Sequence, residues 1–216
     1  MATAPAPQPG PDRSSPPPVP AAPPGPASPA GAPSPPAPDS GPVVITPMRR
    51  RHLRQVLRID HAVYPRPWSL GLYLGELSTT EGRSYLVARR GASVVGYAGL
   101  MVIVDDAHVT TVAVAPQHQH QGLATRLLLV LMREAVALGA ERVTLEVRAS
   151  NREAQALYSR FGFAPAGVRK AYYVDNREDA VIMWAIDVTA VEYADRLARI
   201  EASLPFPSDL QGVRSA

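Results

Sequence analysis

The chain has 216 residues, a formal net charge of +3 and no cysteine. The lack of cysteine excludes a disulfide framework, a thiolate metal site and a cysteine nucleophile. No segment approaches the ~20 apolar residues of a membrane-spanning helix, and the first residues lack the basic and apolar regions of a signal peptide. We therefore expect a cytoplasmic protein that does not use a membrane.

Residues 1–42 differ in composition from the rest of the chain. They hold 17 of the 24 prolines and almost no aliphatic or aromatic side chains. Burial therefore cannot offset the entropy of ordering them, which predicts a disordered, partly polyproline II tail. Such a tail is either a flexible extension without a specific role or a docking site for a proline-reading partner. We expect residues 43–188 to form one domain and 189–216 a C-terminal extension, a short helix and then a tail.

The hydrophobic pattern predicts alternating types of element along the domain. Apolar residues at helical spacing, with caps and breakers, predict helices over 49–63, 69–77, 123–138, 151–162 and 189–204. Period-two patterns predict strands over 43–47, 84–90, 94–104, 109–115, 142–148, 166–174 and 180–188. Gly96 and Gly99 indicate a bulge or a close backbone approach in one of them. This order predicts an α/β domain with a mixed sheet.

The segment Gln119-His120-Gln121-Gly122-Leu123-Ala124 joins the strand that ends at Ala115 to the long helix. The start of a helix leaves backbone N–H groups unpaired beside the positive end of its dipole, an arrangement that binds pyrophosphate. It is neither a Walker loop nor a dinucleotide fingerprint. His118 and His120 lack a third ligand nearby, so we expect no metal.

Here the sequence resembles a family. Gln119-x-x-Gly122-x-Ala124 is similar to the pyrophosphate loop of the GNAT acetyltransferase superfamily, and residues 145–151, 156–163, 169–173 and 178–183 are similar to its ribosomal-protein-alanine N-acetyltransferase branch. The resemblance covers about residues 43–188. It implies the GNAT fold, a mixed, mostly antiparallel twisted sheet flanked by helices, with acetyl-CoA as cosubstrate and no metal. The implied acceptor is a protein N-terminus, the N-terminal alanine of a small-subunit ribosomal protein.

The resemblance also implies a set of residues that contact acetyl-CoA. The strand before the loop would offer backbone groups to the pantetheine arm, one N–H polarising the thioester oxygen. The loop and the helix start would hold the pyrophosphate, and the cap of a later helix would contact the arm. The set is Val112, Ala113, Val114, Gln119, His120, Gln121, Gly122, Leu123, Ala124, Thr125 and Asn151. Family members often place arginines in this loop where the chain has His118, His120 and Gln121, so phosphate binding would rest more on backbone N–H groups.

Two side chains are candidates for proton transfer. In the strand over 142–148, Val143, Leu145 and Val147 share one face and Glu146 points to the other. The pattern alone fits an ordinary solvated glutamate, and the resemblance implies the general base. Tyr158 is the candidate general acid, since a phenol of pKa ~10 stays protonated at rest. It returns to the level of Glu146 if its helix folds back along the strand; the alternative is a packed aromatic residue.

For the acceptor peptide, the resemblance points to Pro65, Trp68, Tyr172 and Tyr173, whose rings would hold its first residues. Trp68 is equally well a core residue. The same fold could instead act on a small amine, or the chain could be a scaffold that binds CoA or a partner without catalysis. RNA binding rests only on the arginines between Arg49 and Arg54, which lack interleaved aromatic residues and fit the solvated face of a helix, so we expect no specific nucleic acid.

Overall fold

The computed structural model describes residues 42–79 and 81–214. Residues 1–41 of the predicted Pro-rich tail therefore lie outside the described residues. No helix in the described part of the chain is long and apolar enough to cross a bilayer.

The predicted α/β fold with a mixed, mostly antiparallel sheet is confirmed. The strands are β1 (Val44–Pro47), β2 (Arg83–Arg90), β3 (Ser93–Ile103), β4 (Asp106–Val114), β5 (Arg142–Arg148), β6 (Ala164–Tyr173), β7 (Glu178–Ala185) and β8 (Asp209–Leu210). The helices are η1 (Arg50–His52), α1 (Leu53–Val63), α2 (Leu70–Ser78), η2 (Pro116–His118), α3 (Leu123–Ala137), α4 (Arg152–Arg160) and α5 (Val191–Ala202).

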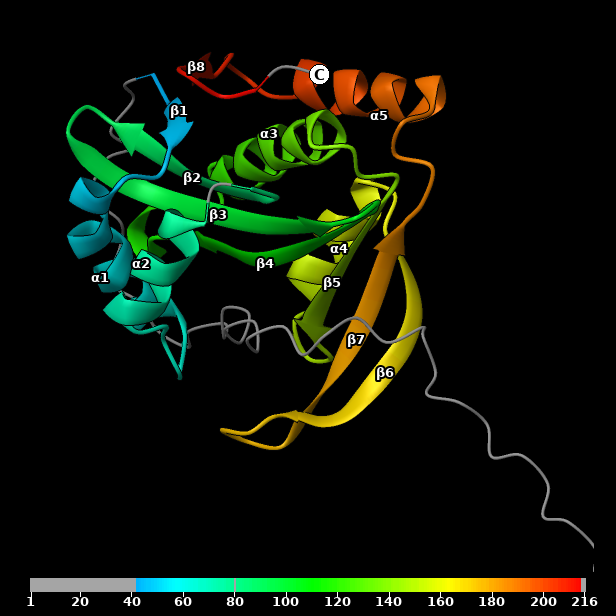
Figure 1. Ribbon diagram of the computed structural model, residues 1–216, viewed down its shortest axis with the longest axis horizontal. Helices are drawn as coiled ribbons and strands as arrows, with labels where there is room; N and C mark the ends of the chain where they lie inside the picture. The colour runs from blue at the N-terminus through cyan, green and yellow to red at the C-terminus, as the bar shows by residue number, and fades with distance from the viewer. Residues whose placement is uncertain (1–41, 80, 215–216) are drawn as a thin grey trace, which may run out of the picture.

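The eight strands form one sheet in the order β6-β7-β5-β4-β3-β2-β1-β8. Neighbouring strands are antiparallel except for two parallel pairs, β4 with β5 and β1 with β8. In Figure 1, β2, β3 and β4 run together across the molecule, whereas β5, β6 and β7 turn away from them. The sheet thus has two halves that meet at the β4–β5 pair.

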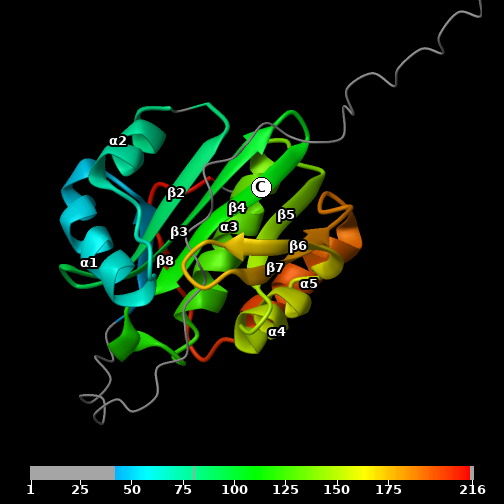
Figure 2. The same cartoon turned by 90° about the horizontal axis from the view of Figure 1, so that it is seen from below.

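Helices cover both faces of the sheet, and each face has its own apolar core. The smaller core lies under α1 and α2 and contains Val56, Trp68, Tyr73 and Tyr97. The larger core lies under α3 and α5, and Leu157 of α4 packs against it. Figures 1 and 2 show α1 and α2 on one side of β2–β4, with α3 and α5 on the other.

Some boundaries differ from the sequence prediction. The first helix is split, because the Arg49 N–H donates to Nδ1 of His52 and holds Arg50–His52 in a 3₁₀ turn before α1. β4 begins at Asp106 rather than Val109, since Ile103 pairs with Asp106 and Val104 turns the hairpin with a φ of 60°. The close approach at Gly99 is confirmed: a Cβ there would lie 2.3 Å from the ring of Tyr85.

The C-terminal segment packs along α3 and returns to the sheet edge. Arg133 of α3 pairs with Glu201 of α5 at 2.7 Å. The buried Arg126 donates to Oγ of Ser208 at 3.0 Å, and β8 then pairs with β1. Residues 203–214 therefore lie against both α3 and β1.

Candidate functional site

The sheet opens where β4 and β5 part. The two strands pair over three residues, the last pair being His108 with Thr144. Beyond it, β5 stays paired with β7, but β4 continues to Val114 without a β5 partner among the described residues. The second half of β4 therefore has no strand partner on this side in the described structure, and side chains reach two of its carbonyls, those of Val112 and Val114. An edge of this kind is what a ligand that extends the strand requires.

Glu146 lies on β5 just beyond this point. The predicted alternation is confirmed, since Val143, Leu145 and Val147 are buried in the larger core. The side chain of Glu146 points to the other face and is only 5% exposed. In the parallel register, residues 144 and 146 share a face with His108, so the strand pairing brings His108 to the carboxylate.

Both carboxylate oxygens of Glu146 have a partner. Oε2 lies 2.6 Å from Nε2 of His108, and Oε1 lies 3.0 Å from Nη1 of Arg169 on β6. Burial alone would raise the pKa of Glu146, but the hydrogen bond to His108 and the charges of His108 and Arg169 outweigh it and hold the pKa below its usual value. Glu146 is therefore ionised at neutral pH. The other ring nitrogen of His108, Nδ1, is buried without a hydrogen-bond partner in the described structure.

Tyr158 lies on α4 with its ring 5.9 Å from that of Phe163. Burial raises the pKa of its hydroxyl to about 12, so the phenol is protonated. Tyr173 on β6 is also buried, and burial raises the pKa of its hydroxyl while the charge of Arg148 lowers it. Glu146, Tyr158 and Tyr173 lie on β5, α4 and β6, which follow one another along the chain on the β5 side of the parting of β4 and β5.

Tyr64 enters the same region from the loop after α1. Its buried hydroxyl donates to the carbonyl of Val112 at 2.9 Å and lies 3.2 Å from Oγ1 of Thr111. Burial raises the pKa of Tyr64, with smaller contributions from Asp60, Tyr158 and Tyr173. The sequence pattern alone indicated no role for Tyr64, His108 or Arg169.

The loop before α3 has the backbone geometry of an anion site. His120 and Gly122 adopt the left-handed region, with φ of 58° and 75°. A Cβ on Gly122 would meet only Leu204, at 3.6 Å, so the backbone conformation rather than crowding favours glycine. No side chain accepts a hydrogen bond from the N–H groups of the first turn of α3. In α2, by contrast, the side chain of Ser69 caps the first turn.

Side chains fix this loop to its surroundings. Gln119 donates to the carbonyl of Val114 at 3.2 Å, and Arg90 donates to Gln121 at 2.7 Å. His120 pairs with Glu153 of α4 at 3.2 Å. Asn151 caps α4 as predicted, accepting from the N–H of Ala154 at 3.0 Å. The His120–Glu153 pair therefore joins the loop to the start of α4, so the predicted cofactor residues converge.

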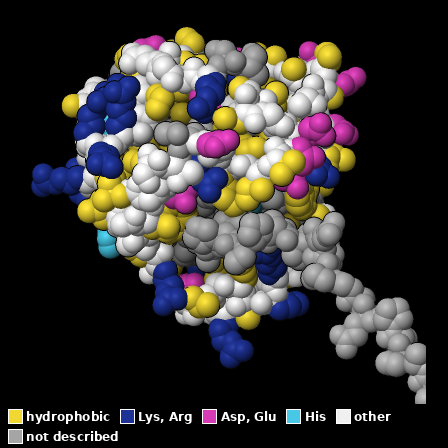
Figure 3. Space-filling model, in the orientation of Figure 1, with side chains coloured by type: hydrophobic (Ala, Val, Ile, Leu, Met, Phe, Trp, Pro, Cys, Tyr) yellow, Lys and Arg dark blue, Asp and Glu magenta, His cyan; other side chains and the backbone are white. Residues whose placement is uncertain are grey.

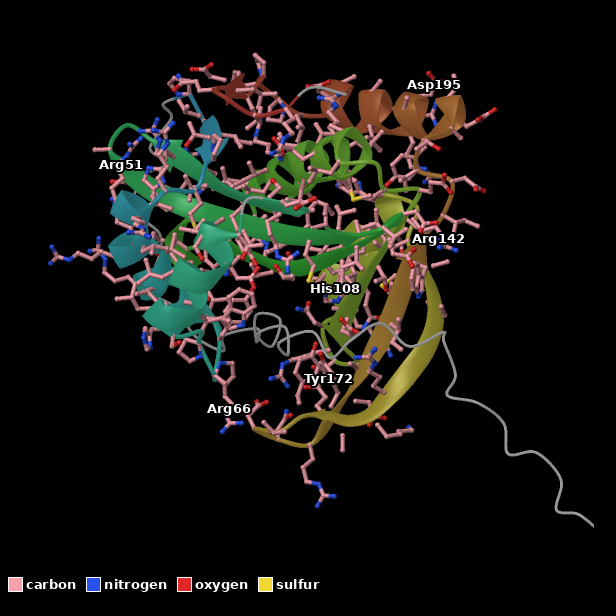
Figure 4. The ribbon with its side chains drawn as sticks, in the orientation of Figure 1. Arg51, Arg66, His108, Arg142, Tyr172 and Asp195 are labelled. Carbon is pink, nitrogen blue, oxygen red and sulfur yellow. The ribbon has the colours of Figure 1, made fainter. Side chains whose placement is uncertain are left out.

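The four predicted acceptor residues are placed differently from one another. Pro65 is exposed, whereas Trp68 is 6% exposed and packs on Tyr73 in the smaller core, as in the second interpretation of the sequence. Tyr173 is 3% exposed beneath the guanidinium of Arg148, 4.0 Å from its ring centroid. Tyr172 contacts Tyr173 edge to face, and Figure 4 shows it on the side of the β6–β7 hairpin that faces His108.

A buried arginine anchors the β6–β7 hairpin to the end of β5. Arg148 is 4% exposed and pairs with Asp175 and Glu178 at 2.8 Å each. The carboxylate of Glu178 also accepts from the N–H of Ser150. This network sets the position of Tyr173 and of the hairpin that supplies Arg169.

Among residues 42–79 and 81–214, no group of three or more His, Cys, Asp or Glu side chains could hold a metal ion.

Comparisons with known proteins agree with this geometry. A model of the acetyltransferase (GNAT) family matches residues 53–163. The putative ribosomal protein bS18-alanine N-acetyltransferase of Bacillus subtilis (strain 168) is 39% identical over 141 residues, 63% of this chain and 91% of the relative. The ribosomal protein bS18-alanine N-acetyltransferase of Escherichia coli (strain K12) is 34% identical over 143 residues, 64% and 94% of the two chains.

A solved structure extends the match to three dimensions. The crystal structure of the ribosomal-protein-S18-alanine N-acetyltransferase from Escherichia coli superposes with a TM-score of 0.63 and 32% identity, covering 69% of this chain and 97% of that chain. The family match spans half of the chain, and the relatives are covered almost completely. The chain therefore belongs to the acetyltransferase (GNAT) family and is an acyltransferase.

Proposed function

We propose that the chain is an acetyl-CoA-dependent Nα-acetyltransferase whose acceptor is the N-terminal alanine of the small-subunit ribosomal protein bS18. The names of two relatives that are covered over nine-tenths of their length support this acceptor. A ribosomal acceptor would place the reaction in the cytoplasm. The catalytic domain spans residues 43–188, with 1–42 a tail that could bind a partner and 189–216 an extension that packs on it.

One observation supports direct transfer most strongly: an ionised, buried Glu146 lies at the parting of β4 and β5, held by His108 and Arg169. Glu146 accepts the proton that the α-ammonium group loses before the neutral amine attacks the thioester carbonyl. A protein α-amino group has a pKa near ~8, so a single positioned base is sufficient near neutral pH. His108 acts as a positioning residue that orients the carboxylate.

Tyr158 stabilises the leaving group. Acetyl-CoA supplies the acetyl group as a thioester; the new C–N bond forms as the C–S bond breaks. A phenol with a pKa of about 12 is a weak donor toward a thiolate whose thiol has a pKa near ~8.5, so complete transfer is uphill. Tyr158 therefore acts chiefly as a hydrogen-bond donor to the developing thiolate. No covalent acyl-enzyme is needed.

The remaining sequence-predicted residues form the binding surface. The backbone of Val112, Ala113 and Val114 receives the pantetheine arm, which Asn151 also contacts, and Gln119 to Thr125 receive the phosphates. In the structure the Val112 carbonyl accepts from Tyr64, so Tyr64 helps to orient this strand. Tyr172 and Pro65 are the accessible members of the proposed acceptor site, and Tyr173 supports them from below.

The test is turnover with acetyl-CoA on a panel of acceptors. Peptides beginning with the bS18 sequence, the same peptides with Ala replaced by Ser, Met or Pro, and spermidine would be compared. We expect transfer to the α-amino group of the alanine peptide, located by mass spectrometry. Turnover on spermidine without turnover on any peptide would contradict the proposal.

A further inference from the structure

An arginine face covers the start of the first helix. It comprises Arg49, Arg50, Arg51, Arg54 and Arg58, all exposed. Arg50, Arg54 and Arg58 recur every fourth residue, so they form a stripe about 12 Å long on one side of η1 and α1. Figure 3 shows Lys and Arg side chains along the edge of the molecule where these elements lie in Figure 1.

Nothing in the described structure neutralises this face. None of its five arginines forms an ion pair with a residue of 42–79 or 81–214, whereas Arg83, Arg133, Arg142 and Arg148 each contact a carboxylate. Between residues 43 and 75, Asp60 is the only acidic residue, and it is fully buried in the smaller core. The arginine face is thus a local excess of charge within a chain whose net charge is only +3.

The arrangement is electrostatically unfavourable for the free protein. Neither η1 nor α1 has an acidic residue in its first turn, so the arginines lie at the positive end of the helix dipole. Like charges four residues apart also repel by about 0.2–0.5 kcal/mol per pair. A bound polyanion would remove both penalties. The positive charge of this face also acts on His52: burial lowers its pKa, and the charges of Arg51, Arg89 and Arg49 lower it further.

The chemistry of the face selects its partner. The guanidinium group binds phosphate through two parallel hydrogen bonds. The apolar side of α1, with Leu53, Val56 and Ile59, is buried in the smaller core, which leaves nothing to insert into a lipid surface. η1 and α1 carry no Phe, Tyr or Trp, and their exposed ring is His61 in the last turn of α1, beyond the arginines. We therefore assign the contacts to the backbone of a duplex.

We propose that the arginine face binds the phosphate backbone of duplex RNA without reading its sequence. The choice of RNA over DNA rests on the proposed ribosomal acceptor. The argument for phosphate binding does not depend on that acceptor. Such binding goes beyond the expectation from the sequence, which took these arginines as the solvated face of a helix. It would hold the enzyme beside an RNA-associated acceptor protein, and α1 leads directly into the loop that carries Tyr64 and Pro65.

The experiment measures binding of the full chain to a fluorescent RNA duplex by anisotropy, from low to physiological salt and without acetyl-CoA or peptide. The test variant combines Arg50→Gln, Arg54→Gln and Arg58→Gln. Its matched control combines Arg160→Gln, Arg177→Gln and Arg199→Gln, three exposed arginines on other elements, and has the same net charge.

We expect the test variant to bind at least ~10-fold more weakly at 0.1 M salt and to lose about 2 to 3 units of the slope of log K against log salt. The control should stay within about twofold of the original chain. The melting temperature of the test variant should not fall, because repulsion is relieved; if it does fall, the single change Arg58→Gln is measured instead, with a slope loss of about 1 expected.

Equal losses in the two triple variants would overturn the proposal, since binding would then follow net charge alone. So would tighter binding to a DNA duplex of the same sequence, or equal competition by poly-glutamate, which would indicate an acidic protein. Acetylation of the alanine peptide is measured separately and should be unchanged in both triple variants. A negative binding result therefore leaves the proposed function intact, and absent turnover leaves the binding result intact.

Discussion

Nε2 of His108 on β4 lies 2.6 Å from Oε2 of Glu146 on β5, across the last residues at which these two strands pair. The contact joins the two halves of the sheet at the point where they part. It also determines the charge state of the proposed base, because the hydrogen bond offsets the burial of Glu146. Glu146, His108 and Tyr158 therefore give separate and distinguishable predictions.

Replacing Glu146 with Gln should lower kcat about 10²–10⁴-fold, since it removes a general base without changing the shape of the side chain. The dissociation constant of acetyl-CoA should change less than about twofold, as Glu146 lies on β5 and not in the loop before α3. The loss should shrink above pH ~8, where the α-amino group is neutral without help. Glu141→Gln, at an exposed position before β5, is the control and should keep full activity.

Replacing His108 with Asn should raise the pKa of Glu146. Burial raises this pKa, while the hydrogen bond and charge of His108 lower it; the His108 contributions are lost in the variant, and the charge of Arg169 remains. Carbon NMR titration of the Glu146 carboxyl would measure the shift directly. At neutral pH we expect kcat to fall about tenfold or more with KM for acetyl-CoA unchanged. A fall in kcat with an unmoved Glu146 titration would show that His108 is only structural.

Much of the domain is predictable from local pattern. The alternation of Val143, Leu145 and Val147 placed Glu146 on the opposite face, and the caps Ser69 and Asn151 begin helices where expected. These features depend on neighbours in sequence, and local periodicity or capping chemistry decides them. The predicted strands over 84–90 and 94–104 and the helix over 123–138 are confirmed for the same reason.

The partners of Glu146 were not predictable in this way. His108 lies 38 positions away in the sequence, and its contact depends on the β4–β5 register, which single-sequence periodicity does not determine. Arg169 lies on β6, whose pairing with β7 shifts between Arg169 and Tyr173. The one available signal was a histidine directly before the predicted strand over 109–115. β8 was missed because its two residues carry too little pattern.

Replacing Tyr158 with Phe should lower kcat about 10²-fold or more, because a positioned donor to the developing thiolate is lost. The ring still packs against Phe163, so stability should be nearly unchanged. Tyr193→Phe is the matched control: it removes a hydrogen bond of 2.9 Å to the carbonyl of Phe161, far from Glu146 in the fold. The control should lose about 1 kcal/mol of stability and no activity.

The Arg148 network should make the hairpin sensitive to acid. Burial of Glu178 would raise its pKa, but hydrogen bonds from Ser150, Arg148 and Asn176 lower it to about 2. A depressed pKa in the folded state contributes stability that is complete above about pH 4.5 and is lost as the pH falls toward 2. Urea unfolding across this window should show a steeper loss in the original chain than in Glu178→Gln. Glu192→Gln, at an exposed position of α5, should retain the steep loss.

The C-terminal segment should stabilise the start of α3. Arg126 is 3% exposed, and Oγ of Ser208 accepts its hydrogen bond at 3.0 Å. Ser208→Ala leaves this buried guanidinium without that acceptor, which should cost about 1–3 kcal/mol and lower the melting temperature by about 2–10 °C. Ser159→Ala, on the exposed side of α4, should have no such effect.

Because Leu204 of the C-terminal segment packs against Gly122, removing residues 204–216 should also raise KM for acetyl-CoA more than it changes kcat. If the truncated chain keeps both its melting temperature and this KM, the segment does not support the loop.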